Sequence, residues 1–225
     1  MTTSALLSAD DFGLDSKANH HIKSLLKERQ LALVSLLVNF PHSSQAVIFY
    51  RQFPTAHLGL HANLTQGSPI SIPQLIPSLV DKKGRFFPLP IFLLKLLLGQ
   101  LNLEDIITEL ENQLNYLTNK KLKTYHLNSH QNIHLFPPLI PIFQRISEKH
   151  HLQLRQTDSV YNRLKYFPIR FLVFEVFRFL LHSRYPKTPT HITGSFKETL
   201  IHPGTNYDNL HPLISRLIHR TTSIE

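Results

Sequence analysis

Three short polar clusters, each placed where a strand-like apolar run stops, constrain the fold of this chain most strongly. They are Ala9–Gly13, Gly59–Thr65 and His126–His134. In an α/β fold the carboxyl ends of the parallel strands converge on a single crevice. Carboxylates and imidazoles gathered there are what a metal-dependent hydrolase needs. The clusters therefore predict an α/β architecture with a site at the carboxyl ends of its strands.

The amino-terminal part alternates between strand-like and helical patterns. We expect strands over Ser4–Ala9, Leu31–Val38 and His57–Leu60, separated by helices over Ser16–Arg29 and from Ser43 to Arg51. A continuous apolar run such as Leu31–Val38 is typical of a parallel strand that is covered on both faces. Strand, helix, strand, helix, strand is the βαβ order of a parallel α/β fold.

The rest of the chain is less regular. Prolines punctuate Ser68–Pro90, and we expect a long substrate-facing excursion there because interior proline breaks both helices and strands. Beyond it we expect helices over Leu103–Leu117, Pro137–His150, Tyr166–His182 and Leu210–Ile218, and strands over Thr124–Leu127, Leu152–Leu154 and Thr199–Ile201. A chain of 225 residues without a linker-like run predicts a single domain, 1–225.

Composition narrows the classes of protein and of partner. The chain has no cysteine, so any metal must be held by nitrogen and oxygen ligands. This, with no export signal apparent at the amino terminus, favours a cytoplasmic protein. No apolar run reaches the roughly 20 residues of a membrane-spanning helix. The formal net charge of +9 suits an anionic partner, but the basic residues are dispersed and no motif indicates nucleic-acid binding, so we expect no nucleic-acid partner.

Asp10 and Asp11 stand side by side at the end of the first predicted strand. Two adjacent buried carboxylates repel each other unless a cation or a shared proton relieves them. The usual division of labour in such a pair is one metal ligand and one general base. The alternative is that Asp11 merely caps the following turn, which is the more frequent role of an isolated Asp.

Histidines supply the rest of the pattern. A histidine such as His61 at a strand end is more often a core residue than a ligand. His126, His130 and His134 recur every four residues, but the flanking residues favour a strand followed by a loop over a helix. A plain polar loop is the alternative in a chain with 15 histidines. One Asp with two His is nevertheless a common ligand set for a catalytic divalent ion that keeps positions open for water and substrate.

Taken together, these strings resemble the YdjC-like (ChbG-like) carbohydrate deacetylases. The matching segments follow in order along the chain: Ala9–Leu14, Asn19, Val38-Asn39, Gly59–Gly67, His126–His134 and His202–Gly204. The third motif departs from the family at two positions, with Asn128 in place of an Asp and Asn132 in place of a further His. The resemblance implies an α/β fold, a distorted (β/α) barrel of the polysaccharide-deacetylase-like type, here with shortened late elements.

The resemblance also implies a reaction: metal-assisted hydrolysis of the acetyl amide of an N-acetylated sugar, which could be an oligosaccharide, a sugar phosphate or a glycolipid. Carried over to this chain, the implied ligands of the divalent ion (Mg²⁺ or Zn²⁺) are Asp11, His61 and His130. Asp10 is then the general base and His202 the acid that protonates the departing amine, while Arg155 holds Asp10 ionised. The alternative is a catalytically weakened or inactive carbohydrate-binding relative.

Two further predictions concern partners. The basic charge and the apolar segment Phe86–Leu101 predict peripheral contact with an anionic membrane surface. A homodimer is the assembly we expect.

Overall fold

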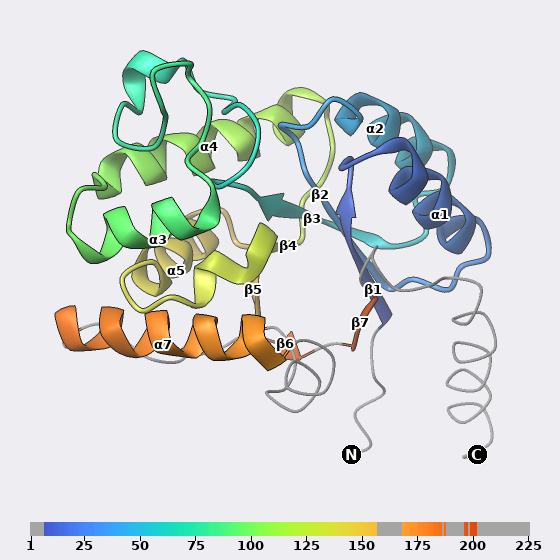
Figure 1. Cartoon of the computed structure of the whole chain (residues 1–225). Helices are drawn as coiled ribbons and strands as arrows, with labels where there is room; N and C mark the ends of the chain where they lie inside the picture. The colour runs from blue at the N-terminus through green and yellow to red at the C-terminus, as the bar shows by residue number, and fades with distance from the viewer. Residues whose placement is uncertain (1–6, 157–167, 186, 188–195, 198, 202–225) are drawn as a thin grey trace.

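The computed structural model describes residues 7–156, 168–185, 187, 196–197 and 199–201. Within them a sheet of seven strands has the order β6-β5-β4-β3-β2-β1-β7, and every pairing is parallel (Figure 1). The strands are β1 (Leu7–Phe12), β2 (Leu33–Leu36), β3 (His57–Ala62), β4 (His126–Ser129), β5 (Gln153–Gln156), β6 (Phe196–Lys197) and β7 (Thr199–Ile201). The helices are α1 (Ser16–Lys27), α2 (Ser43–Gln52), α3 (Leu89–Leu97), α4 (Leu103–Asn119), α5 (Ile140–Lys149) and α7 (Pro168–Arg184), with the short 3-10 helices η1 (Pro73–Leu75) and η2 (His130–Leu135).

The two edge strands bring the ends of the sheet together. β6 pairs with β5 and β7 pairs with β1, yet the two strands are separated by a single position in the sequence. The segment from Phe196 to Ile201 therefore connects one edge of the sheet to the other, and β6 and β7 lie next to each other in Figure 1. This arrangement confirms the predicted α/β class and is consistent with a distorted barrel.

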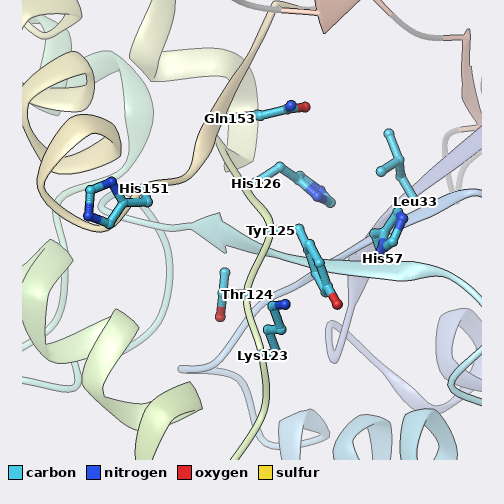
Figure 2. Close-up of a pocket in the computed structure, with 8 residues that line it drawn as sticks. All are labelled: Leu33, His57, Lys123, Thr124, Tyr125, His126, His151 and Gln153. Atoms are coloured by element: carbon cyan, nitrogen blue, oxygen red, sulfur yellow. The ribbon is translucent and has the colours of Figure 1, made fainter.

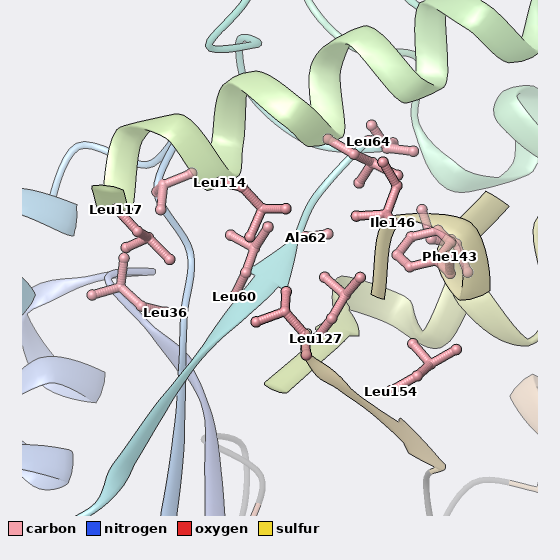
Figure 3. Close-up of a cluster of buried hydrophobic side chains, with 14 of the residues drawn as sticks. Leu36, Leu60, Ala62, Leu64, Leu114, Leu117, Leu127, Phe143, Ile146 and Leu154 are labelled. Atoms are coloured by element: carbon pink, nitrogen blue, oxygen red, sulfur yellow. The ribbon is translucent and has the colours of Figure 1, made fainter. Parts of the chain in front are cut away.

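Side chains alternate between two faces along the strands, and the two faces differ in chemistry. Outward-facing residues are apolar and lie in one buried cluster with side chains of α4 and α5 (Figure 3): Leu36, Leu60, Ala62, Leu127 and Leu154 with Leu114, Leu117, Phe143 and Ile146. Inward-facing residues are polar and hydrogen-bond to one another across the strands: Ser8, Asp10, Ser35, His126, Asn128 and Arg155. The apolar core thus lies between sheet and helices, and the barrel interior holds a polar network.

The predicted βαβ order is confirmed, since β1, α1, β2, α2 and β3 follow one another along the chain. The main difference in boundaries is at β1, which continues to Phe12 rather than ending at Ala9. The predicted final strand, Thr199–Ile201, is present as β7. The helix predicted over Leu210–Ile218 lies outside the described residues, and the shortening of late elements stays a prediction.

The sequence patterns do not predict helix α3. Pro88 and Pro90 favour a break in regular structure, but the structure places Pro88 at the N-cap and Pro90 in the first turn of α3. Proline costs little there because the first N–H groups of a helix have no partner within it. No helix among the described residues combines the length and the hydropathy needed to cross a membrane.

Buried carboxylates of α4 hold the excursion that follows β3. Glu109 is 0% exposed, and its two carboxylate oxygens accept hydrogen bonds from the backbone N–H groups of Ile70 and Ser71, both at 2.9 Å. One turn earlier on α4, Asp105 accepts from the backbone N–H of Ser78 at 2.9 Å. Backbone donors that would otherwise be buried without an acceptor are therefore satisfied by one face of α4.

Replacing Glu109 with Ala is expected to lower the free energy of unfolding by about 2–4 kcal/mol, because two backbone donors lose their acceptors. Glu109→Gln should cost less, since the amide oxygen still accepts one of the bonds. Glu104, an exposed residue in the first turn of the same helix, supplies the control Glu104→Ala. Urea unfolding followed by circular dichroism measures all three, and equal losses for Glu109→Ala and Glu104→Ala would contradict this role.

Candidate metal centre

A bulge in β1 brings Asp10 and Asp11 to the same end of the barrel. In a regular strand the two side chains would point to opposite faces. Here the register between β1 and β2 shifts between Ala9 and Phe12, and Asp11 adopts a positive φ of 61°. A positive φ is uncommon for residues other than glycine and is found preferentially at functional sites. The bulge therefore brings the two adjacent carboxylates to one end of the barrel. The sequence alone suggests this convergence but does not show how it is reached.

The side chains of Asp11, His61 and His130 form a compact cluster. Each offers one ligand atom, and these atoms all lie within 4.8 Å of one another. Oδ1 of Asp11 is 2.8 Å from Nδ1 of His130 and 3.1 Å from Nε2 of His61. The side chain of Asp11 is only 15% exposed, that of His130 11% and that of His61 4%. Two imidazole nitrogens and one carboxylate oxygen fit a divalent ion and leave coordination positions open.

The protonation of the cluster follows from burial and from its mutual contacts. Burial raises the pKa of Asp11, but hydrogen bonds from His130 and His61, together with their charge, outweigh burial and hold this pKa well below its ordinary value. Burial lowers the pKa of His61, but the carboxylates of Asp10 and Asp11 outweigh it and raise this pKa. The cluster therefore stabilises a carboxylate next to imidazolium, and a divalent cation can replace that positive charge.

Asn128 orients His61. Its side-chain oxygen lies 2.9 Å from Nδ1 of His61, and its Nδ2 donates to the two carboxylate oxygens of Asp10 at 3.2 and 3.3 Å. Because Nδ1 of His61 donates to this amide, Nε2 is the nitrogen that faces Asp11. An outer hydrogen bond of this kind sets which imidazole nitrogen is offered to a metal. Asn128 thus contacts both the Asp10 carboxylate and the His61 imidazole.

Asp10 is paired with Arg155 inside the barrel. Nη1 of Arg155 donates to Oδ1 of Asp10 at 2.6 Å and Nη2 donates to Oδ2 at 2.5 Å. Arg155 is 0% exposed and Asp10 is 4% exposed. A bidentate guanidinium pair of this geometry compensates a buried carboxylate and fixes its orientation. Asp10 therefore differs from Asp11: its oxygens face an arginine, whereas those of Asp11 face two histidines.

The polypeptide after β4 turns sharply to present His130. Gln131 and Asn132 both have a positive φ of 56°, a conformation that Asn tolerates better than most residues. Nε2 of His130 lies 3.2 Å from the side-chain oxygen of Gln66, in the loop after β3. His134 does not join the metal cluster, because its ring lies between the Ser129 hydroxyl at 2.6 Å and the backbone oxygen of Arg155 at 3.0 Å.

The structure brings together all but one of the six residues to which the resemblance assigns a role. Asp10, Asp11, His61, His130 and Arg155 gather at the carboxyl ends of β1, β3, β4 and β5. The remaining candidate, His202, lies outside the described residues. The sequence patterns did not indicate the contacts of Ser35, His126 or Gln66, because these depend on which residues meet across the barrel.

A pocket lies at the opposite end of the same strands. Figure 2 shows its lining at the starts of β2, β3, β4 and β5, formed by Leu33, His57, His126 and Gln153 with Lys123–Tyr125 and His151. The candidate metal cluster sits at the carboxyl ends of these strands and takes no part in this lining.

The affinity for a divalent ion is expected to rise with pH through the neutral range. The raised pKa of His61 means that its ring still carries both protons at pH values where a free imidazole has lost one. A bound ion must displace the proton on the nitrogen that faces Asp11, so the apparent dissociation constant should fall by up to about tenfold per pH unit. Calorimetry with Zn²⁺ from about pH 6 to about pH 8 measures this, and a dissociation constant independent of pH would contradict it.

Comparison with known proteins identifies relatives of the chain. The family described as YdjC-like protein matches residues 4–219. A carbohydrate deacetylase of Brevibacillus brevis is 33% identical over 155 residues, which is 67% of this chain and 58% of that protein. A chitooligosaccharide deacetylase of Serratia marcescens is 29% identical over 151 residues, again 67% and 58%. The chain thus spans less than two thirds of the length of these curated relatives.

A solved structure shares the fold. The crystal structure described as that of a cellobiose-phosphate cleavage protein from Enterococcus faecalis matches with a TM-score of 0.65, covering 92% of this chain and 83% of that chain at 23% identity. The family match extends from the start of β1 to beyond β7, and it includes every residue of the metal cluster. On these grounds the chain belongs to the YdjC-like protein family.

Proposed function

We propose that this chain is a metal-dependent hydrolase that removes the acetyl group from an N-acetylated sugar. The observation that carries the proposal is the placement of the Asp11, His61 and His130 cluster beside a carboxylate, Asp10, that is paired with a buried arginine. Relatives named carbohydrate deacetylase and chitooligosaccharide deacetylase support the same substrate class. Peripheral membrane contact and homodimerisation stay predictions from the sequence.

The residues of the metal cluster divide the work in this proposal. Asp11, His61 and His130 hold the ion, Mg²⁺ or Zn²⁺, and Asn128 keeps Nε2 of His61 directed towards it. The ion, when bound, supplies a Lewis acid that makes water more acidic and polarises the acetyl carbonyl. Three protein ligands leave coordination positions open for the water and for the acetyl carbonyl oxygen.

The remaining residues handle protons. Asp10 accepts the proton of the attacking water as general base, and the bidentate contact with Arg155 fixes the direction of its carboxylate. Attack of the water oxygen forms a C–O bond to the acetyl carbon, and collapse of the tetrahedral adduct then breaks the C–N bond, so the departing amine needs one proton. His202 is the proposed donor of that proton, on the basis of the motif His202–Gly204.

The deciding experiment measures acetate release from N-acetylated chito-oligosaccharides by the purified protein. We expect release with added Mg²⁺ or Zn²⁺, and loss of release after treatment with a chelator followed by recovery on adding the ion back. Sugar binding without acetate release under any divalent ion would reject the proposal and favour the non-catalytic carbohydrate-binding relative instead.

A further inference from the structure

A row of three residues crosses the barrel interior below the metal cluster. Ser35 on β2, Gly59 on β3 and His126 on β4 are aligned by the parallel register, Ser35 with Gly59 and Gly59 with His126. A Cβ atom at Gly59 would lie 2.2 Å from Nε2 of His126, so the ring occupies the space that any other residue would fill. Glycine at this position therefore lets the His126 ring lie across β3 and reach β2.

The ring ends on the Ser35 hydroxyl, which in turn contacts Arg155. Nε2 of His126 is 2.9 Å from Oγ of Ser35, and Nη1 of Arg155 donates to the same Oγ at 2.9 Å. Nη1 also donates to Oδ1 of Asp10 at 2.6 Å and lies 3.3 Å from Oγ of Ser8. Ser35, His126 and Arg155 are at most 1% exposed, so water does not compete for these bonds.

The direction of the bonds follows from the chemistry of the three groups. A guanidinium only donates, so the Ser35 oxygen accepts from Arg155 and its hydroxyl hydrogen remains to be donated. Burial, followed by the charge of Arg155, lowers the pKa of His126 to about 3, so its imidazole is neutral. A neutral imidazole offers a lone pair to that hydroxyl, whereas an imidazolium would place a second positive charge beside the guanidinium.

We propose that His126 and Ser35 are positioning residues that hold the Arg155 guanidinium in the orientation in which it contacts both oxygens of Asp10. This inference rests on the proposed function, in which Asp10 is the general base. Hydrogen bonds link His126 to Ser35, Ser35 to Arg155 and Arg155 to Asp10, so both residues act on Asp10 through the guanidinium. The sequence motifs did not single out Ser35, and they contained His126 without assigning it a role.

The first test is Ser35→Ala, which removes the hydroxyl and leaves the rest of the interior in place. We expect kcat to fall roughly tenfold while KM stays within about twofold, because the alignment of the base matters in the transition state and not in sugar binding. Ser147→Ala is the matched control: it deletes another buried hydroxyl, 6% exposed, on α5. This hydroxyl donates to the backbone oxygen of Leu152, just before β5, and is not part of the cluster. The control should leave kcat unchanged.

The second test separates a positioning role from simple packing at His126. His126→Leu removes the acceptor of the Ser35 hydroxyl and should lower kcat to a similar extent, whereas His126→Gln, which retains a polar group near the position of Nε2, should restore most of it. The double variant Ser35→Ala with His126→Leu should be no slower than the slower single variant, since both changes interrupt one chain of contacts. Multiplicative losses in the double variant would overturn the proposal.

A third measurement does not depend on turnover. Asp10 accepts from both Nη atoms of Arg155 and Ser35 accepts from Nη1, so the guanidinium should give separate Nη1 and Nη2 signals in ¹⁵N NMR of the wild type. Ser35→Ala removes one of the bonds at Nη1 and should raise the rate at which the two signals exchange. Assignment comes from Arg155→Lys. Averaged signals in the wild type, or an exchange rate that is unchanged in Ser35→Ala, would overturn the network. A wild type that releases no acetate would contradict the proposed function alone, while the NMR result would still decide this inference.

Discussion

Replacing Asp11 with Asn is expected to abolish tight binding of a divalent ion and to reduce acetate release by about a thousandfold or more. Asp11 supplies the carboxylate of the cluster, and its Oδ1 contacts a ring nitrogen of each of the two histidines. An amide oxygen carries no charge and is a much weaker ligand. The variant also removes the negative charge that contacts the rings of His61 and His130. Calorimetric titration with Zn²⁺ and Mg²⁺ measures the loss directly.

The backbone at this position makes Asn a clean substitution. Asp11 has a positive φ, and Asn is among the residues that adopt this conformation most readily, so the bulge of β1 should be retained. Asp15→Asn is the matched control, because Asp15 caps α1 by accepting from the Ala18 backbone N–H and Asn caps equally well. Ion binding by Asp11→Asn as tight as that of Asp15→Asn would remove Asp11 from the ligand set.

The clusters at the strand ends were predictable from the sequence because they depend on local patterns. Apolar runs with a strand period ended at Asp10, His61 and the His126–His134 motif, and parallel strands necessarily bring such ends together. The resemblance to a family then distinguished Asp11 from Asp10. What local patterns could not show is the bulge that turns both carboxylates to one side, because a register shift arises between β1 and β2 rather than within either strand.

The polar interior of the barrel is not predictable from local sequence patterns for a related reason. The apolar run Leu31–Val38 predicts a strand covered on both faces, and no local pattern marks Ser35 in its middle. In the structure one face of β2 packs under helices through Val34 and Leu36, while Ser35 faces the barrel interior. Ser35 contacts an arginine that lies more than a hundred residues away in the sequence. This contact depends on closure of the barrel, which local sequence patterns do not predict.

Asn128 shows how a departure from a family motif acquires a physical meaning only in three dimensions. Its amide accepts from the imidazole of His61 and donates to the carboxylate of Asp10. A carboxylate at position 128 could accept from His61, but it would lie about 3 Å from Asp10 with no hydrogen to donate unless it carried a proton. Asn therefore satisfies both neighbours in the described structure, and the orientation of His61 does not require Asp at this position.

Asp10→Asn is expected to separate catalysis from ion binding. The amide cannot accept a proton from water, so kcat should fall by roughly a hundredfold to ten-thousandfold, the usual contribution of a general base. In the proposed site the ion is held by Asp11, His61 and His130, so its dissociation constant should change far less than in Asp11→Asn. The substitution also leaves Arg155 as a buried charge without its carboxylate, which is expected to lower the free energy of unfolding by about 3–5 kcal/mol.

That stability cost determines how the experiment must be done. Saturating divalent ion stabilises the folded state, because the ion binds only the assembled cluster, so kcat and thermal unfolding should be measured with the ion present. Arg155→Met provides a companion variant that keeps the Asp10 carboxylate and removes its partner. If Asp10 is the base and Arg155 only orients it, Arg155→Met should retain more activity than Asp10→Asn at equal folded fraction. Loss of ion binding in Asp10→Asn would instead place Asp10 among the ligands and leave the base unassigned.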